Sequence, residues 1–126
     1  MKKIFASAAV ILTSAISLNA VAGGNVAAGK ALVDKFQCAS CHGQDFKSPI
    51  DPAYPKLAGQ HDDYLEHALI AYRRGGDGPN GRANAIMGPQ VNRPGNGGKV
   101  EPLSDQDIKD ISAYLHSLPG TLVVRK

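Results

Sequence analysis

The chain has 126 residues, which is enough for one folded domain of ordinary size but not for two. Hydrophobic residues make up 43% of it and charged residues 20%, as in an ordinary soluble globular protein. The formal charge is only +3, and no basic stripe is interleaved with aromatic residues, so the sequence gives no argument for a nucleic-acid partner.

Residues 1–22 have the pattern of a secretory signal peptide. Two lysines precede an apolar run of 15 residues from Ile4 to Leu18, and small residues before Gly23 form a cleavage pattern. The run is shorter than the roughly 20 residues that a membrane-spanning helix needs. We expect cleavage after Ala22, export to the periplasm and a mature domain of residues 23–126 that does not span the membrane. Loss of this leader, which has two lysines and no acidic residue, would lower the formal charge from +3 to +1.

The first element after the leader is predicted to be a helix over residues 25–37. Val26, Gly29, Val33 and Phe36 recur at helical spacing along one face. Gly29 within this face costs about 1 kcal/mol of helix propensity relative to alanine. A glycine in the apolar face therefore predicts that another helix crosses very close to it.

The only two cysteines of the chain follow this helix, in the pentapeptide Cys38-Ala39-Ser40-Cys41-His42. Cysteines at this spacing can belong to a zinc site, a thiol–disulfide pair or a covalent haem attachment. A zinc site needs four ligands, and there is no further cysteine. A thiol–disulfide pair would begin a helix after a strand, whereas this pair follows a helix. The histidine directly after Cys41 favours haem c, bound through Cys38 and Cys41, with His42 as an iron ligand.

Two further helices are predicted, separated from the motif and from each other by irregular segments. Three prolines predict that residues 44–60 form a loop. Residues 62–74 have an apolar side and two aspartates in the first turn, which suits the helix dipole. The last helix is predicted to begin after Ser104 as N-cap, with Asp107 at the capping-box position, and to stop at Pro119.

Residues 75–102 contain eight glycines and four prolines, and they predict a loop of 28 residues. A loop of this length is unusual in a small domain unless something organises it. It contains Met87, the only methionine left after removal of the leader, and a thioether is a known axial ligand of haem iron. The alternatives are Met87 as a filler of the core, a vacant axial position, or ligation by His61, His67 or His116.

With these residues the chain resembles a class I c-type cytochrome of the small soluble bacterial kind. The resemblance extends over residues 24–118. It rests on Cys38-Ala39-Ser40-Cys41-His42-Gly43, Gly29-Lys30-Ala31-Leu32, Tyr54-Pro55-Lys56-Leu57-Ala58-Gly59-Gln60, Met87, Leu103-Ser104-Asp105 and Ala113-Tyr114-Leu115. It implies an all-α cytochrome c fold, in which three to four helices and loops wrap around one covalently attached haem.

The resemblance also implies how the first and last helices meet. They would cross with Gly29 at the contact, against Ile111 and Tyr114. Two features depart from the family pattern: Val33 stands where an aromatic residue is usual, and residues 90–102 are longer than the usual link to the last helix. The longer link could shape a docking surface, but an ordinary surface loop is the simpler interpretation.

Three more site residues follow from the resemblance. The backbone carbonyl of Pro55 would accept a hydrogen bond from His42 and so fix the orientation of the imidazole ring. Leu57 and Tyr72 would pack near the haem, although either residue could equally belong to an ordinary core.

If His42 and Met87 both bind the iron, no position is left for a substrate, so the predicted function is electron transfer and not catalysis. We expect a monomeric periplasmic one-electron carrier. The resemblance implies a cytochrome bc complex or a dehydrogenase as donor, and a terminal oxidase, reductase or peroxidase as acceptor. The alternatives are a haem c subunit of a multicomponent periplasmic oxidoreductase, and a gas-binding or peroxidatic haem that Met87 does not ligate.

Overall fold

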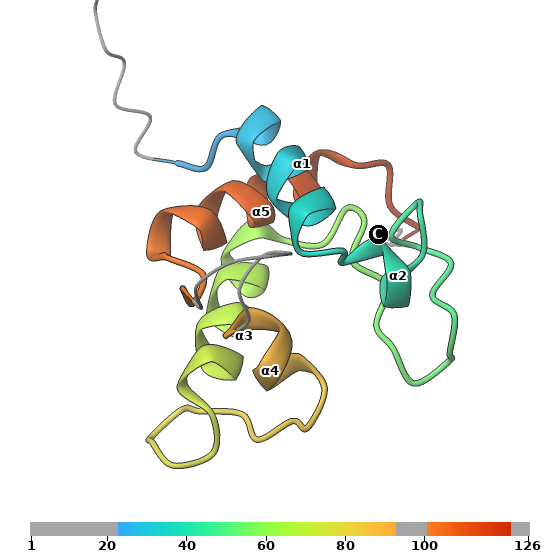
Figure 1. The fold of residues 1–126 in the computed structure, drawn as a ribbon. Coiled ribbons are helices and arrows are strands. Elements are labelled where there is room, and N and C mark those ends of the chain that lie inside the picture. Colours follow the sequence, from blue (N-terminus) through green and yellow to red (C-terminus); the bar gives the residue numbers. More distant parts are fainter. Residues whose placement is uncertain (1–22, 93–100, 122–126) are drawn as a thin grey trace, which may run out of the picture.

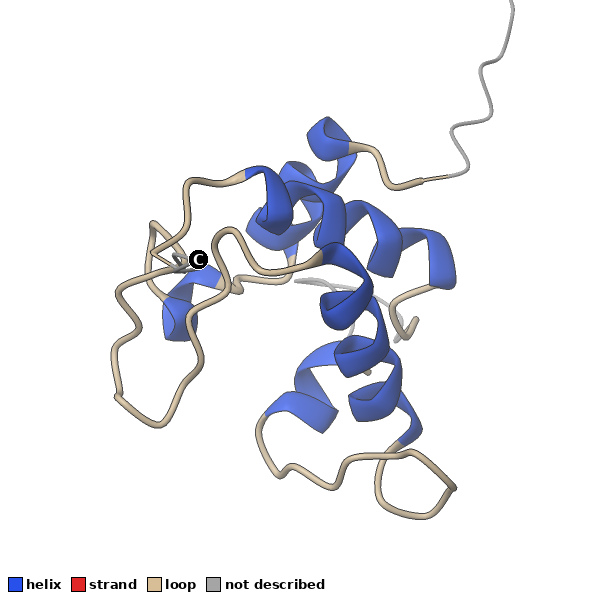
Figure 2. Ribbon diagram, turned by 180° about the vertical axis from the view of Figure 1, so that it is seen from behind, coloured by secondary structure: helices blue, strands red, loops and turns tan. Residues whose placement is uncertain are grey.

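A computed structural model describes residues 23–92 and 101–121, and all regular structure in these ranges is helical (Figures 1 and 2). The elements are α1 (Val26–Lys35), α2 (Ala39–His42), α3 (Asp62–Arg74), α4 (Met87–Val91) and α5 (Asp105–Ser117). The three long helices lie where the sequence predicts them. The predicted leader with its cleavage site, and most of the long link before the last helix, lie outside the described residues.

Helix α1 is shorter at both ends than its apolar pattern predicts. Asn25 is its N-cap, because the Asn25 side chain accepts a hydrogen bond from the backbone N–H of Ala28 at 2.9 Å. The helix ends at Lys35, two residues early, because Gln37 has a left-handed φ of 54°. That turn directs the chain into the cysteine motif.

The glycine of α1 lies against α5, which crosses α1 in Figure 1. A Cβ atom on Gly29 would lie 1.9 Å from the carbonyl oxygen of Asp110 and 2.8 Å from the Cβ of Tyr114. The predicted close crossing is therefore confirmed, with Asp110 and Tyr114 nearest to the glycine and Ile111 in the core beside them. The buried Asp110 carboxylate also accepts a hydrogen bond from the backbone N–H of Asn25 at 2.7 Å, which ties the start of α1 to α5.

One apolar cluster joins the helices to the loop that precedes α3. Its buried members come from α1, the loop, α3, α4, the approach to α5 and α5 itself: Val33, Phe46, Ala58, Leu65, Val91, Leu103, Ile108, Ile111 and Leu115. Val33, which stands where an aromatic residue is usual in the family, is only 1% exposed and is therefore a buried core residue. Phe46 packs edge-to-face on Tyr114, with ring centroids 6.2 Å apart.

Helices α2 and α4 are short, and the sequence pattern does not predict them as separate elements. Four and five residues are too few to show a period of 3.6. Helix α4 also contains a glycine and a proline, which read as loop signals. Pro89 is tolerated because the first N–H groups of a helix have no partner within the helix. Part of the predicted loop of residues 75–102 is therefore helical, and α4 begins at Met87.

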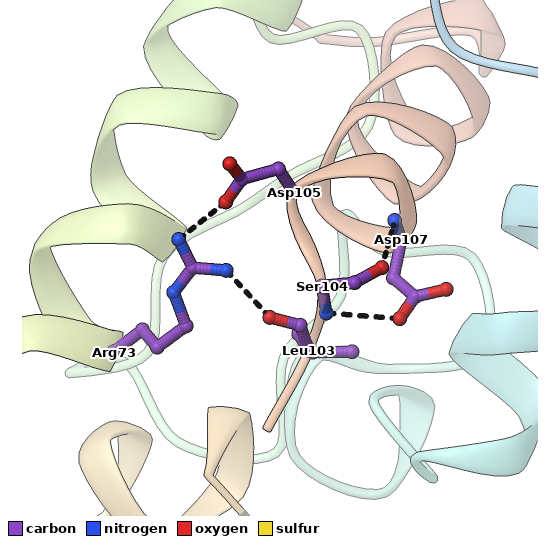
Figure 3. A network of polar contacts seen from close by, with 5 residues as sticks. All are labelled: Arg73, Leu103, Ser104, Asp105 and Asp107. Atoms are coloured by element: carbon purple, nitrogen blue, oxygen red, sulfur yellow. Dashed lines mark hydrogen bonds and ion pairs between the residues drawn. The ribbon is translucent and has the colours of Figure 1, made fainter. Parts of the chain in front are cut away.

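Polar contacts connect the end of α3 to the start of α5 (Figure 3). The Arg73 guanidinium donates to the carbonyl oxygen of Leu103 at 2.6 Å and to the carboxylate of Asp105 at 2.5 Å. Ser104 and Asp107 form the predicted capping box, with bonds of 3.1 and 2.9 Å in the two directions. Within residues 23–92 and 101–121, no helix combines the length and the apolar character needed to cross a membrane.

Candidate haem-binding site

His42 is the last residue of α2 and is only 5% exposed. Its Nδ1 lies 2.9 Å from the carbonyl oxygen of Pro55, which is the hydrogen bond that the family resemblance implies. A carbonyl can only accept, so Nδ1 carries the hydrogen and Nε2 keeps its lone pair in the neutral ring. The contact therefore leaves Nε2 as the nitrogen that can bind a metal, and it fixes the orientation of the ring.

Cys38 and Cys41 are presented by one helical turn. Cys38 is the N-cap of α2, and the backbone N–H groups of Cys41 and His42 both donate to its carbonyl oxygen, at 3.3 and 3.1 Å. Residues three apart in a helix are neighbours on its surface, so both sulfur atoms can reach one edge of a planar group. The two thiols form no disulfide, and burial raises the pKa of the Cys38 thiol to about 11, as expected beside apolar side chains.

The loop after the motif brings Pro55 back to His42. Gly43 has a φ of 83°, and a Cβ there would lie 2.2 Å from the carbonyl oxygen of Ser48, so this position needs glycine. Asp45 caps the same turn by accepting from the backbone N–H groups of Lys47 and Ser48, at 3.0 and 2.8 Å. The bond from Lys47 is the main reason that the pKa of the Asp45 carboxyl is lowered. The sequence motif includes Gly43 but does not reveal its role in this turn, and Asp45 was not predicted, although an Asp that bonds the backbone two residues on is a common turn former.

Four predicted site residues, from four separate parts of the chain, pack against the same apolar core. All are partly buried: Cys38, Leu57, Tyr72 and Met87. Leu57 is held there by its backbone N–H, which donates to the carbonyl oxygen of Phe46 at 2.7 Å. Partly buried apolar side chains on one core, together with the buried His42 and two thiols, have the chemistry that an apolar, covalently attached haem requires.

Met87 differs from the competing ligands in its surroundings. It is half-buried at the start of α4, and the Asn84 side chain accepts hydrogen bonds from its backbone N–H, at 2.7 Å, and from that of Ile86. The three alternative histidines, His61, His67 and His116, are all exposed. Met87, by contrast, is partly buried and packs against the core that Cys38 also contacts.

These features define an all-α protein whose cysteine pair and buried histidine are arranged for a covalently held haem. The family model of cytochrome c matches residues 26–119. The chain therefore belongs to the cytochrome c family, and it carries one haem c, attached covalently through Cys38 and Cys41. The predicted all-α cytochrome c fold is confirmed, and electron transport is the function of this class.

Individual relatives sharpen this assignment. The chain is 36% identical over 124 residues to cytochrome c4 of Stutzerimonas stutzeri, covering 97% of this chain and 53% of that protein. It is 41% identical over 96 residues to cytochrome c-554(548) of Halomonas halodenitrificans, covering 75% of this chain and 96% of that one. The crystal structure of reduced recombinant cytochrome c4 from Pseudomonas stutzeri superposes with a TM-score of 0.62 at 35% identity, over 79% of this chain and 48% of that one. The chain thus spans about half the length of its cytochrome c4 relatives.

Proposed function

We propose that the chain is a one-electron carrier whose haem iron is ligated by His42 on one side and Met87 on the other. The observation that carries this proposal is that Cys38 and Met87, 49 residues apart, pack against the same apolar core. The haem would supply reversible exchange of one electron between its ferrous and ferric states. The chain would supply two ligands, an apolar environment and a fixed geometry.

Each proposed ligand has a separate support in the chain. The Pro55 carbonyl holds the His42 ring with Nε2 free, so the imidazole needs no rearrangement to bind. Met87 would contribute a neutral thioether, and a neutral ligand in an apolar site disfavours the additional charge of ferric iron. Leu57 and Tyr72 would contact the haem and exclude water from it, because both are partly buried on the same core. Together these features favour the reduced state and raise the reduction potential.

Two protein ligands would leave no open position for a substrate, which supports a carrier without catalytic activity. The leader pattern of residues 1–22 supports cleavage after Ala22 and work in the periplasm by a mature domain of residues 23–126. A formal charge near zero after cleavage supports weak electrostatic steering and short-lived contacts of a monomer with its redox partners. The donor would be a cytochrome bc complex or a dehydrogenase, and the acceptor a terminal oxidase, reductase or peroxidase.

The ligand assignment is tested by replacing Met87 with alanine in the exported holoprotein. The ferric wild type should show the sulfur-to-iron charge-transfer band at neutral pH. Met87→Ala should lack that band and should bind added cyanide much more tightly, because an axial position opens. His67→Ala, which removes an exposed histidine of α3, is the matched control and should behave as the wild type. A wild type without the band, or unchanged cyanide binding in Met87→Ala, would exclude Met87 as the ligand.

The carrier assignment is tested by the oligomeric state of the purified holoprotein. A free carrier should elute from a sizing column as a monomer at micromolar concentration. Stoichiometric co-elution with a larger enzyme from the native host would instead show that the chain is a bound haem subunit.

A further inference from the structure

The segment between α3 and α4 is tied back to α3 at Arg82. Residues 82–86 are exposed, yet the backbone N–H of Arg82 donates to the carbonyl oxygen of Ala71 at 2.9 Å. The Arg82 guanidinium also lies over two rings of α3, 5.9 Å from the centroid of Tyr64 and 5.6 Å from that of Tyr72. These rings are eight residues apart, so one side chain bridges about two turns of α3.

A second tie follows Met87 and ends on the same turn of α3. The Asn92 side-chain amide donates to the carbonyl oxygen of Arg73 at 3.3 Å and to that of Gly88 at 3.0 Å. Met87 is five residues after Arg82 and five residues before Asn92. The methionine is therefore held midway between two attachments to the last turns of α3.

The link between Arg82 and Met87 is short and internally fixed. The Asn84 side chain accepts from the backbone N–H groups of both Ile86 and Met87, at 2.9 and 2.7 Å. A five-residue link with this side-chain turn has little freedom to absorb a displacement at one end. Movement of Arg82 away from α3 would consequently move the start of α4, where Met87 lies.

We propose that Arg82 is a positioning residue for Met87: its clamp on Tyr64 and Tyr72 holds the segment so that the thioether stays on the iron. This inference rests on the proposed ligation by Met87. An external ligand can bind only in molecules whose Met87 has left the iron, so its apparent affinity follows the population of that open state. Weakening the clamp raises this population and the apparent affinity by the same factor.

The test is a titration of the ferric holoprotein with imidazole at pH 7. Arg82→Gln removes the cation and should raise the affinity for imidazole about fivefold, the factor expected at the lower end for losing two exposed cation–π contacts. Arg82→Lys keeps a cation over the rings and should recover most of the wild-type value. Arg74→Gln is the matched control, because Arg74 is also exposed at the end of α3 but lies outside the clamp, and it should change nothing.

A double variant separates positioning from a general loss of stability. In the Met87→Ala background, Arg82→Gln should no longer change the affinity for imidazole, because the site is already open. Equal affinities in the wild type and Arg82→Gln, or an equal rise in Arg74→Gln, overturn the proposal. If Arg82→Gln folds poorly, Tyr64→Leu removes one ring without touching the backbone tie. It should raise the affinity by a smaller factor, and no rise would overturn the proposal.

The failure of this inference is distinguishable from failure of the proposed function. If Met87 is not a ligand, Met87→Ala binds imidazole as the wild type does and the ferric wild type lacks the sulfur-to-iron band. If Met87 is a ligand and Arg82 does not position it, Met87→Ala gains affinity while Arg82→Gln does not.

Discussion

The region where α1 meets α5 and the region where α3 meets α4 and the start of α5 are held together by different kinds of contact. At Gly29 the backbones of α1 and α5 approach so closely that a single methyl group has no room. Around the end of α3 the shared apolar core is supplemented by hydrogen bonds that the side chains of Arg73 and Asn92 make to backbone carbonyls, and by the Arg82 clamp.

This difference implies that substitutions in the two regions reduce the stability of the protein in different ways. Close packing is lost abruptly when a volume changes, because protein interiors have few voids to absorb it. Hydrogen bonds at a partly exposed surface are lost gradually and one at a time, each with a modest effect on stability. The cysteine motif follows directly on the closely packed region, whereas Met87 depends on the region of polar ties.

The largest effect is expected from Gly29→Ala. The new Cβ would lie 1.9 Å from the Asp110 carbonyl oxygen, so α1 and α5 would have to separate. We expect the free energy of unfolding of the holoprotein to fall by about 3 kcal/mol in a denaturant titration. Gly78→Ala is the control, because nothing lies within 4 Å of its added Cβ, and it should stay within about 0.5 kcal/mol of the wild type. Similar losses in both variants would contradict the packing argument.

A smaller loss is expected from Arg73→Gln. The glutamine cannot keep both charged hydrogen bonds of Figure 3, and we expect a loss of about 1.5 kcal/mol, mostly through the bond to the Leu103 carbonyl. The pair with Asp105 adds little, because that carboxylate side chain is 77% exposed. Arg74→Gln in the same denaturant titration should have almost no effect. Equal effects at the two positions would show that general charge, and not this contact, matters.

The cap of α5 should contribute less again. Ser104→Ala removes the acceptor for the backbone N–H of Asp107 and should cost about 1 kcal/mol of stability. Ser104→Thr keeps a hydroxyl at the N-cap and should restore most of it. If alanine and threonine prove equally stable in thermal unfolding, the capping box does not stabilise the helix.

The smallest effect is expected in the pH dependence of stability. The bond from Arg73 is the main reason that the pKa of the Asp105 carboxyl lies below its ordinary value of 3.8. A lowered pKa in the folded state stabilises the protein above the ordinary value, and this stabilisation disappears as the pH falls through the folded value. Asp105→Asn should therefore reduce stability slightly at pH 6 and progressively less as the pH falls below the ordinary value of 3.8. A difference that persists unchanged into acid would exclude this linkage.

The long helices and the haem motif could be predicted from the sequence because their signals are local. An apolar face repeated over three or more turns marks α1, α3 and α5, and the pentapeptide ending in His42 carries its chemistry within five residues. Met87 could be proposed because the chain offers no other sulfur outside the leader and the cysteines. Local patterns of this kind can be recognised without knowing which residues are neighbours in the folded protein.

The features that escaped prediction depend on contacts between distant residues or on very short elements. Helices α2 and α4 are each about one turn, too short for periodicity to appear. The hydrogen bond from Arg73 to Leu103 spans 30 residues, and no local sequence pattern around either residue predicts it. Arg82 looks like an ordinary surface arginine in a glycine-rich loop until the structure places its guanidinium over two tyrosines.

The crossing of α1 and α5 also has a consequence for the order of events during synthesis. The hydrogen bond between Asn25 and Asp110 joins residues 85 positions apart, so it cannot form until nearly the whole chain has been made. Joining residues so far apart closes a long loop, which costs more chain entropy than closing a short one. Cys38 and Cys41 precede α5 in the chain, so in the proposed export they would also enter the periplasm before it, on a chain that still lacks the α5 part of its core.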